Sequence, residues 1–218
     1  IVSKGFTEGF YYKPRVDLAV LKEYHEGIIA LSACLAGEVA RYLQRGMYED
    51  AKAAALRYQD IFGEGNFFLE LQDHGIPAQQ VVNQELLRMH EETGIDLVAT
   101  NDVHYTKAED AAPHDILLCL QTNKKLADED RMRYEGGQYY VKSPEEMAQL
   151  FPYALEALEN THKIAQRCHV EIEFGVTKLP KFDVPQGYTS WEYLNELCFK
   201  GLEERYQPVT EELKERLN

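Results

Sequence analysis

The chain has 218 residues, of which 44% are hydrophobic and 28% charged, a composition typical of globular proteins. Its formal net charge of −14 argues against a large nucleic-acid footprint, because such a surface needs clustered Lys and Arg. No apolar run approaches the roughly 18 residues of a membrane span, and no secretory signal opens the chain. We therefore expect a cytoplasmic protein whose four cysteines are free thiols.

Hydrophobic periodicity predicts alternating helices and strands in the first half of the chain. The predicted helices cover residues 16–26, 38–45, 48–62 and 77–92. Short apolar runs predict buried strands at 27–32, 67–71 and 95–99. This alternation is typical of βαβ units, so we expect an α/β fold with a mainly parallel sheet.

The second half is predicted to be mainly helical. We expect helices at 107–121, with Pro113 near the start or at a kink, then at 152–168, 190–206 and 210–217. Ser143 is predicted to cap a further helix in a capping box with Glu146, and Ser190 to cap the helix that follows it. Short strands are predicted at 138–142 and 169–174, and a Pro-containing linker near 179–187.

Polar side chains follow each of the three buried strands. The endings are 32–34 (Ser-Ala-Cys), 72–74 (Gln-Asp-His) and 101–104 (Asn-Asp-Val-His). Ligands of parallel α/β folds gather at the carboxyl ends of the strands, so these three endings are expected to converge on one site.

Asp102 and His104 form the most informative pair in the chain. They are two residues apart, so on an extended backbone their side chains point to the same side. A carboxylate beside an imidazole can supply half of a Zn²⁺, Mn²⁺ or Fe site, or a base with the group that orients it. The alternative is a structural Asp and a surface His at a capped strand end.

Cys34 and His74 are the next candidates. Cys34 is a metal ligand if it faces the Asp102–His104 pair, and otherwise a small packing residue. His74 is a ligand, a group that orients a ligand, a substrate contact, or a turn histidine bonded to backbone. Asp73 and Asn101 are further candidates for orienting a ligand or contacting substrate.

Five stretches resemble one family, in the same order and with the same spacing. They are residues 31–38, 67–75, 100–105, 114–122 and 140–147. The family is that of the alpha subunits of bacterial replicative DNA polymerase III, in the latter part of their N-terminal PHP (polymerase and histidinol phosphatase) domain.

The resemblance implies a partial, distorted (β/α)₇ PHP barrel that lacks its first strands. Residues 1–177 would be the C-terminal part of the PHP domain, 178–188 a linker, and 189–218 the first helices of the polymerase palm region. The family's metal ligands include an early H-x-H, a Cys and a late D-x-H. The last two correspond to Cys34, Asp102 and His104, whereas the H-x-H is absent. We therefore expect a piece of a longer protein, inactive by itself.

The parent implied by the resemblance is a DNA-directed DNA polymerase, a nucleotidyltransferase that uses DNA, deoxynucleoside triphosphates and other replisome subunits. Its complete PHP site would bind divalent metal, Zn²⁺ or Mn²⁺, and hydrolyse phosphodiesters in 3′–5′ proofreading, or would serve as a structural scaffold. Mg²⁺ would act at the polymerase site outside these residues. The piece is also expected to self-associate, since a partial barrel exposes sheet edges. The alternative is a free-standing PHP phosphatase of small phosphate esters, which residues 179–218 disfavour.

Overall fold

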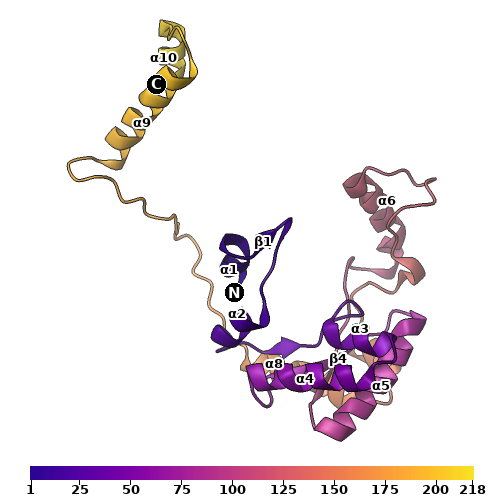
Figure 1. Ribbon diagram of the computed structural model, residues 1–218. Helices are drawn as coiled ribbons and strands as arrows, with labels where there is room; N and C mark the ends of the chain where they lie inside the picture. The colour runs from indigo at the N-terminus through magenta and orange to yellow at the C-terminus, as the bar shows by residue number, and fades with distance from the viewer. The chain divides into compact units, whose positions relative to one another are not determined.

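The computed structural model describes residues 1–218, which form two compact units, residues 1–169 and 170–218 (Figure 1). Helices and short strands alternate through the first half of the first unit, as predicted. In chain order these elements are α1 (Val2–Thr7), β1 (Phe10–Tyr11), β2 (Lys13–Pro14), α2 (Leu18–Glu23), β3 (Ala30–Leu31), α3 (Glu38–Gln44), α4 (Tyr48–Phe62), β4 (Phe67–Leu71), α5 (Pro77–Thr93) and β5 (Leu97–Ala99).

The central sheet has three parallel strands in the order β3-β4-β5, which confirms the predicted parallel arrangement. Ala30 lies opposite Phe67, and Leu69 lies opposite Leu97. β3 is shorter than the predicted strand at 27–32. Gly27 has a φ of +74°, so it turns the chain, and backbone pairing with β4 begins only at Ala30.

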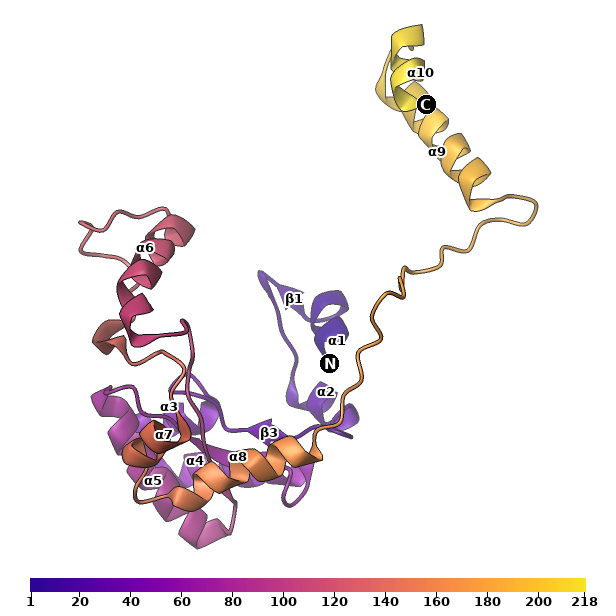
Figure 2. The same ribbon diagram turned by 180° about the vertical axis from the view of Figure 1, so that it is seen from behind.

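One face of the sheet builds the hydrophobic core. Alternate residues of β4, namely Phe67, Leu69 and Leu71, pack into a single buried cluster with side chains of α3, α4 and α5. α8 (Leu155–Arg167) packs along β5. Figure 2, which shows the molecule from the opposite side, has this helix in front. The buried Asn160 of α8 donates a hydrogen bond to the carbonyl of Leu97 (2.8 Å), which attaches this helix to the strand.

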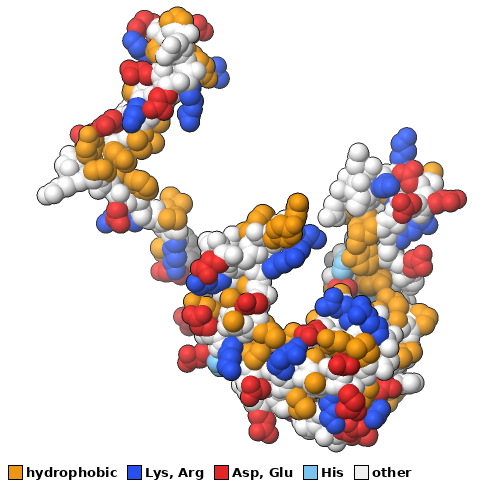
Figure 3. All heavy atoms as spheres, in the orientation of Figure 1, with side chains coloured by type: hydrophobic (Ala, Val, Ile, Leu, Met, Phe, Trp, Pro, Cys, Tyr) orange, Lys and Arg blue, Asp and Glu red, His pale blue; other side chains and the backbone are white.

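The segment before the sheet carries an element that the sequence did not predict. β1 and β2 form an antiparallel hairpin, and α1 packs against both strands. Tyr12 is the single residue between the strands and has a φ of +58°. The aromatic side chains of this hairpin are exposed next to Lys and Arg (Figure 3).

The second half of unit 1 corrects two predictions. The helix predicted at 107–121 is divided into a 3₁₀ turn, η1 (Ala108–Asp110), and α6 (Ala111–Thr122), so Pro113 lies in the first turn of α6 where its missing N–H does no harm. The strand predicted at 138–142 is wrong, because only Tyr140 pairs, in an isolated bridge with Tyr105. A second 3₁₀ turn, η2 (Glu135–Gly137), lies just before it.

The capping box predicted at Ser143 is confirmed at the start of α7 (Pro144–Leu150). The Ser143 hydroxyl accepts from the Glu146 N–H (3.2 Å), and the Glu146 carboxylate accepts from the Ser143 N–H (2.8 Å).

Unit 2 contains α9 (Ser190–Arg205) and α10 (Glu211–Leu217). The prediction that Ser190 caps α9 is wrong, since Thr189 is the cap and forms the capping box with Glu192. The reciprocal bond needs an acidic side chain three residues ahead, which Thr189 has and Ser190 lacks. The strand predicted at 169–174 is also wrong, because this segment has no strand neighbour to pair with. No helix of the protein has the length and apolar character needed to cross a membrane.

Replacing Leu69 tests the position of the core. Leu69 is fully buried in β4, so Leu69→Ala is expected to lower the free energy of unfolding by about 3 kcal/mol, through lost burial and a residual cavity. The control is Leu117→Ala on the exposed side of α6, where a change within about 0.5 kcal/mol is expected. Urea unfolding followed by circular dichroism measures both. Equal losses would contradict this assignment of the core.

Candidate functional site: the carboxyl ends of the three strands

The Glu70 carboxylate joins the ends of all three strands. It projects from the central strand β4 and accepts hydrogen bonds from the backbone N–H of Ala33 (3.1 Å) after β3 and from the hydroxyl of Thr100 after β5. The amide of Gln72 also donates to Glu70 (3.4 Å) and to Thr100 (3.2 Å). The Glu70 carboxylate therefore links the ends of β3, β4 and β5.

The end of β3 is held in an unusual backbone conformation. Ala33 has a φ of +67°, in the left-handed region that residues with a Cβ seldom adopt. Its N–H is bonded to Glu70, and the backbone N–H of Glu70 donates in turn to the hydroxyl of Ser32 (2.8 Å). These two bonds fix the direction in which the chain leaves β3 toward Cys34.

His74 is buried and holds the backbone that follows β5. Its Nε2 accepts a hydrogen bond from the backbone N–H of Asp102 (3.2 Å), and its ring stacks on Tyr139 with centroids 4.6 Å apart. Burial lowers the pKa of the His74 imidazole, although the nearby charge of Asp102 acts in the opposite direction. A neutral ring is also what the hydrogen bond requires, because Nε2 must keep its lone pair in order to accept.

Asp102 and His104 lie side by side, as the spacing predicted. Nδ1 of His104 is 3.5 Å from Oδ1 of Asp102 and 3.3 Å from the Asp102 carbonyl oxygen. Both of these oxygens can only accept, so the proton of the neutral imidazole belongs on Nδ1. Nε2 of His104 then accepts from the hydroxyl of Tyr134 (2.6 Å).

The imidazole of His104 is enclosed by other rings. The centroid of Tyr134 is 4.1 Å away, and those of His114 and Tyr139 are 5.7 Å away. Burial raises the pKa of the Tyr139 phenol, and the charge of Asp102 adds to this shift. Asp102 and His104 thus lie beside a cluster of aromatic rings, and the lone pair of His104 Nε2 points at the Tyr134 hydroxyl.

The remaining predicted residues have local partners. Asp73 accepts hydrogen bonds from the Gly75 N–H (2.9 Å) and the Gln80 amide (2.6 Å), and Asn101 donates to the carbonyl of Tyr140 (2.7 Å). Cys34 is exposed and lines a small cleft with Glu70 and Gln72. The structure contains no group of three or more His, Cys, Asp or Glu side chains arranged to hold a metal ion, so Cys34 is not gathered with Asp102 and His104.

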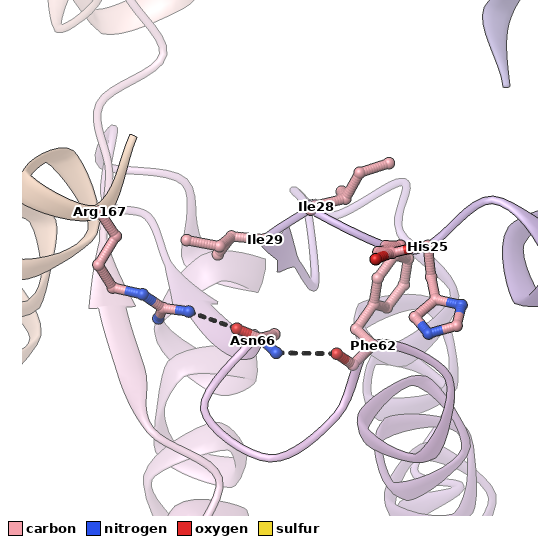
Figure 4. A pocket seen from close by; sticks show the side chains of 8 residues that line it. His25, Ile28, Ile29, Phe62, Asn66 and Arg167 are labelled. Carbon is pink, nitrogen blue, oxygen red and sulfur yellow. Dashed lines mark hydrogen bonds between the residues drawn. The ribbon is translucent and has the colours of Figure 1, made fainter. Parts of the chain in front are cut away.

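Two further cavities lie near the sheet. One, of about 620 Å³, is lined by Asp73, His74 and residues of η2. The other, of about 360 Å³, lies among the residues that precede β3 and β4 (Figure 4). There the Arg167 guanidinium donates to the Gly65 carbonyl (2.7 Å) and to the Asn66 side chain. These hydrogen bonds within the protein give the guanidinium a structural role.

Sequence reasoning missed Tyr134, which comes from the loop after α6 and carries no motif. Its distance in sequence from His104 left no pattern to detect. The sequence does indicate that Glu70 is paired, because an acidic residue inside a buried strand needs hydrogen-bond partners.

The first 74 residues match the family model described as the PHP domain. This match ends before Asp102 and His104.

Nearly the whole chain is similar to proteins named DNA polymerase III subunit alpha. It is 44% identical to that of Treponema pallidum over 98% of this chain, 43% identical to that of Deinococcus radiodurans over 94%, and 41% identical to that of Thermus aquaticus over 94%. It spans 18%, 16% and 17% of their lengths, respectively. The resemblance predicted from the motifs is therefore confirmed: the chain is homologous to one part of the DNA polymerase III alpha subunits.

Changing Glu70 tests whether its carboxylate holds the strand ends together. Glu70→Ala leaves the Ala33 N–H and the Thr100 hydroxyl without their acceptor and is expected to lower the free energy of unfolding by about 2 kcal/mol. Glu70→Gln should lose less, since one carbonyl oxygen remains and the Thr100 hydroxyl can rotate to accept.

The matched control is Glu91→Ala at an exposed position of α5, with an expected change within about 0.5 kcal/mol. Chemical denaturation measures all three variants. A loss for Glu70→Ala no larger than that of the control would contradict the linking role.

The protonation of His104 is open to direct measurement. Long-range ¹H–¹⁵N NMR of the neutral imidazole is expected to show the Nδ1–H tautomer, with Nε2 unprotonated. Tyr134→Phe should shift the ¹⁵N resonance of His104 Nε2, because it removes the hydroxyl that donates to this atom. The control is Tyr140→Phe, which should leave the resonance unchanged, because the Tyr140 hydroxyl donates to Glu146 (2.7 Å) instead. An Nε2–H tautomer would overturn the assignment.

Proposed function

We propose that the chain is a segment of the alpha subunit of a bacterial replicative DNA polymerase, in the part that contains the PHP domain. The observation that carries this proposal is the identity of about 40% over nearly the whole chain to alpha subunits of several bacteria. The complete protein would be a cytoplasmic nucleotidyltransferase that copies DNA from deoxynucleoside triphosphates, together with other replisome subunits. Its Mg²⁺-dependent polymerase site would lie outside these residues.

Within this proposal, residues 1–177 are the C-terminal part of a (β/α)₇ PHP barrel, 178–188 a linker, and 189–218 the first helices of the palm region. The parallel β3-β4-β5 sheet, with helices packed on it, supports a barrel segment. All the relatives described above carry the polymerase name, which favours this assignment over a free phosphatase of small phosphate esters. Self-association of the segment by itself stays a prediction.

We propose further that Asp102 and His104, with Cys34, supply part of a divalent metal centre. The donor chemistry fits Zn²⁺ or Mn²⁺: the carboxylate of Asp102 pairs with the His104 imidazole, and that imidazole has its lone pair on Nε2. The structure brings Asp102 and His104 together and leaves Cys34 apart from them. Two donors are fewer than the three or four protein ligands usual for Zn²⁺, so Cys34 and further ligands would have to join the pair to complete the site.

The bound metal would activate water for attack on a phosphodiester, the chemistry of 3′–5′ removal of nucleotides. The chain's own residues would have distinct tasks. Asp102 would ligate through its carboxylate and keep the proton of His104 on Nδ1. His74 would hold the Asp102 backbone through its Nε2. The Tyr134 hydroxyl would have to move away from His104 Nε2 before that atom could ligate.

A purely structural role of the domain is the second candidate. One observation favours it: the Glu70 carboxylate accepts hydrogen bonds from the Ala33 N–H and the Thr100 hydroxyl and so joins β4 to the ends of both neighbouring strands. Metal content separates the two candidates.

The test is metal content of the full-length alpha subunit, measured by inductively coupled plasma mass spectrometry. The double variant Asp102→Ala, His104→Ala is expected to lose at least one equivalent of Zn²⁺ or Mn²⁺. The control Asp60→Ala, His162→Ala removes an exposed carboxylate and an exposed imidazole elsewhere and should retain the metal. Equal metal in all three proteins would contradict the ligand assignment, and no metal in any of them would favour the scaffold.

A further inference from the structure

The hairpin formed by β1 and β2 presents aromatic rings to solvent. Phe10, Tyr11 and Tyr12 are consecutive, with exposed fractions of 59%, 66% and 83%, and the nearby Phe6 of α1 is 58% exposed. Buried aromatic residues contribute to stability through the area that they remove from water, and these four contribute little in that way.

The hairpin is closed by backbone contacts that do not depend on its aromatic rings. The N–H of Arg15 donates to the carbonyl of Gly9 (3.1 Å), and Tyr11 lies opposite Lys13 in the strand pair. A Cβ on Gly9 would lie 1.9 Å from the Arg15 carbonyl oxygen, so only glycine permits this close approach. The rings contact one another in pairs, Phe6 with Phe10 (centroids 6.4 Å apart) and Tyr11 with Tyr12 (4.7 Å apart), and their remaining surface faces solvent.

Tyr12 occupies a position that disfavours its own residue type. With a φ of +58° it lies in the left-handed region, where Gly and Asn are the common residues. It is also the most exposed of the four aromatic residues, so no burial offsets this backbone cost. Backbone strain of this kind is concentrated at functional sites, which makes the exposed Tyr12 ring a candidate for contact with a ligand.

Two cationic side chains lie close to the exposed aromatic rings of the hairpin. Lys13 and Arg15 flank the tip and have no ion-pair partner, and the Arg15 guanidinium lies 5.8 Å from the centre of the Tyr11 ring. The neighbouring Lys4 is paired with Glu8 (2.6 Å). In a chain of net charge −14, this tip is a local site of attraction for anions.

We propose that the β1–β2 hairpin binds single-stranded DNA, with nucleobases stacked on Tyr12 and Phe10 and backbone phosphates near Lys13 and Arg15. Exposed aromatic rings between cations are the combination with which proteins hold single strands without reading their sequence. The acidic remainder of the chain repels a polyanion, so the contact is confined to a few nucleotides. The choice of DNA rests on the proposed function, whereas the stacking and charge argument does not.

Fluorescence anisotropy of a labelled oligo(dT) at low salt tests the proposal on the chain itself. Tyr12→Asn is expected to weaken binding about tenfold, because a stacking ring is lost. Asn is tolerated in the left-handed region, so the melting temperature should stay the same or rise. Tyr206→Asn, at a half-exposed position in unit 2, is the control and should bind like the unmodified chain.

The charge contribution is tested by salt dependence. Lys13→Gln, Arg15→Gln is expected to reduce the slope of log K against log salt by about one to two, because two phosphate contacts are lost. Lys124→Gln, Lys125→Gln removes two exposed cations elsewhere and should leave the slope unchanged.

Three results would overturn the proposal: no binding of oligo(dT) by the unmodified chain, equal binding by Tyr12→Asn, or an unchanged salt slope in the hairpin double variant. Self-association that Tyr12→Asn abolishes in sedimentation velocity, without any DNA binding, would assign the rings to a protein contact instead. Metal content does not depend on residues 9–15, so this proposal and the metal centre can fail separately.

Discussion

The hydrogen bonds of the Glu70 carboxylate are the interaction on which the arrangement of the strand ends depends. β4 is the central strand, and its polar side chain reaches the ends of both neighbours, at Ala33 and at Thr100. Short parallel strands such as the two-residue β3 have few ladder bonds of their own, so a side chain that joins them has a large relative effect. A partly buried carboxylate that lost these donors would also bear a desolvation cost, which makes the arrangement cooperative.

The position of Asp102 and His104 follows from this constraint. Thr100 fixes the end of β5, and the next residues are held by side chains from other elements: Asn101 bonds to the Tyr140 carbonyl, and the Asp102 N–H bonds to His74. The Tyr105–Tyr140 bridge ties the segment down at its far end. The pair is therefore carried on a short backbone segment restrained at several points, which is the rigidity that a ligand pair or a base with its orienting group requires.

The sequence predicted the features that are encoded locally. The Ser143 capping box and the buried strands at 67–71 and 95–99 depend on neighbouring residues, and the structure confirms the box and shows β4 and β5 within these ranges. The strands predicted at 138–142 and 169–174 failed because a strand also needs a partner, and no alternation of residues reveals whether one is present. The contact between Tyr134 and His104 could not be predicted either, because it joins residues far apart in sequence. The spacing of Asp102 and His104, in contrast, was enough to predict that their side chains lie on the same side.

Hydrogen bonding separates the acidic residues at the strand ends into two kinds. Glu70 and Asp73 have their oxygens occupied by N–H and O–H donors of the chain, so a cation there would have to displace bonds that support the fold. Asp102 has a half-exposed carboxylate that pairs with the His104 imidazole. The lone pair of His104 Nε2 is held by a single neutral hydroxyl, a weaker partner than a divalent cation. Asp102 and His104 are therefore less committed to the fold than Glu70 and Asp73, while the bond between Glu70 and Thr100 fixes the strand end that precedes the pair.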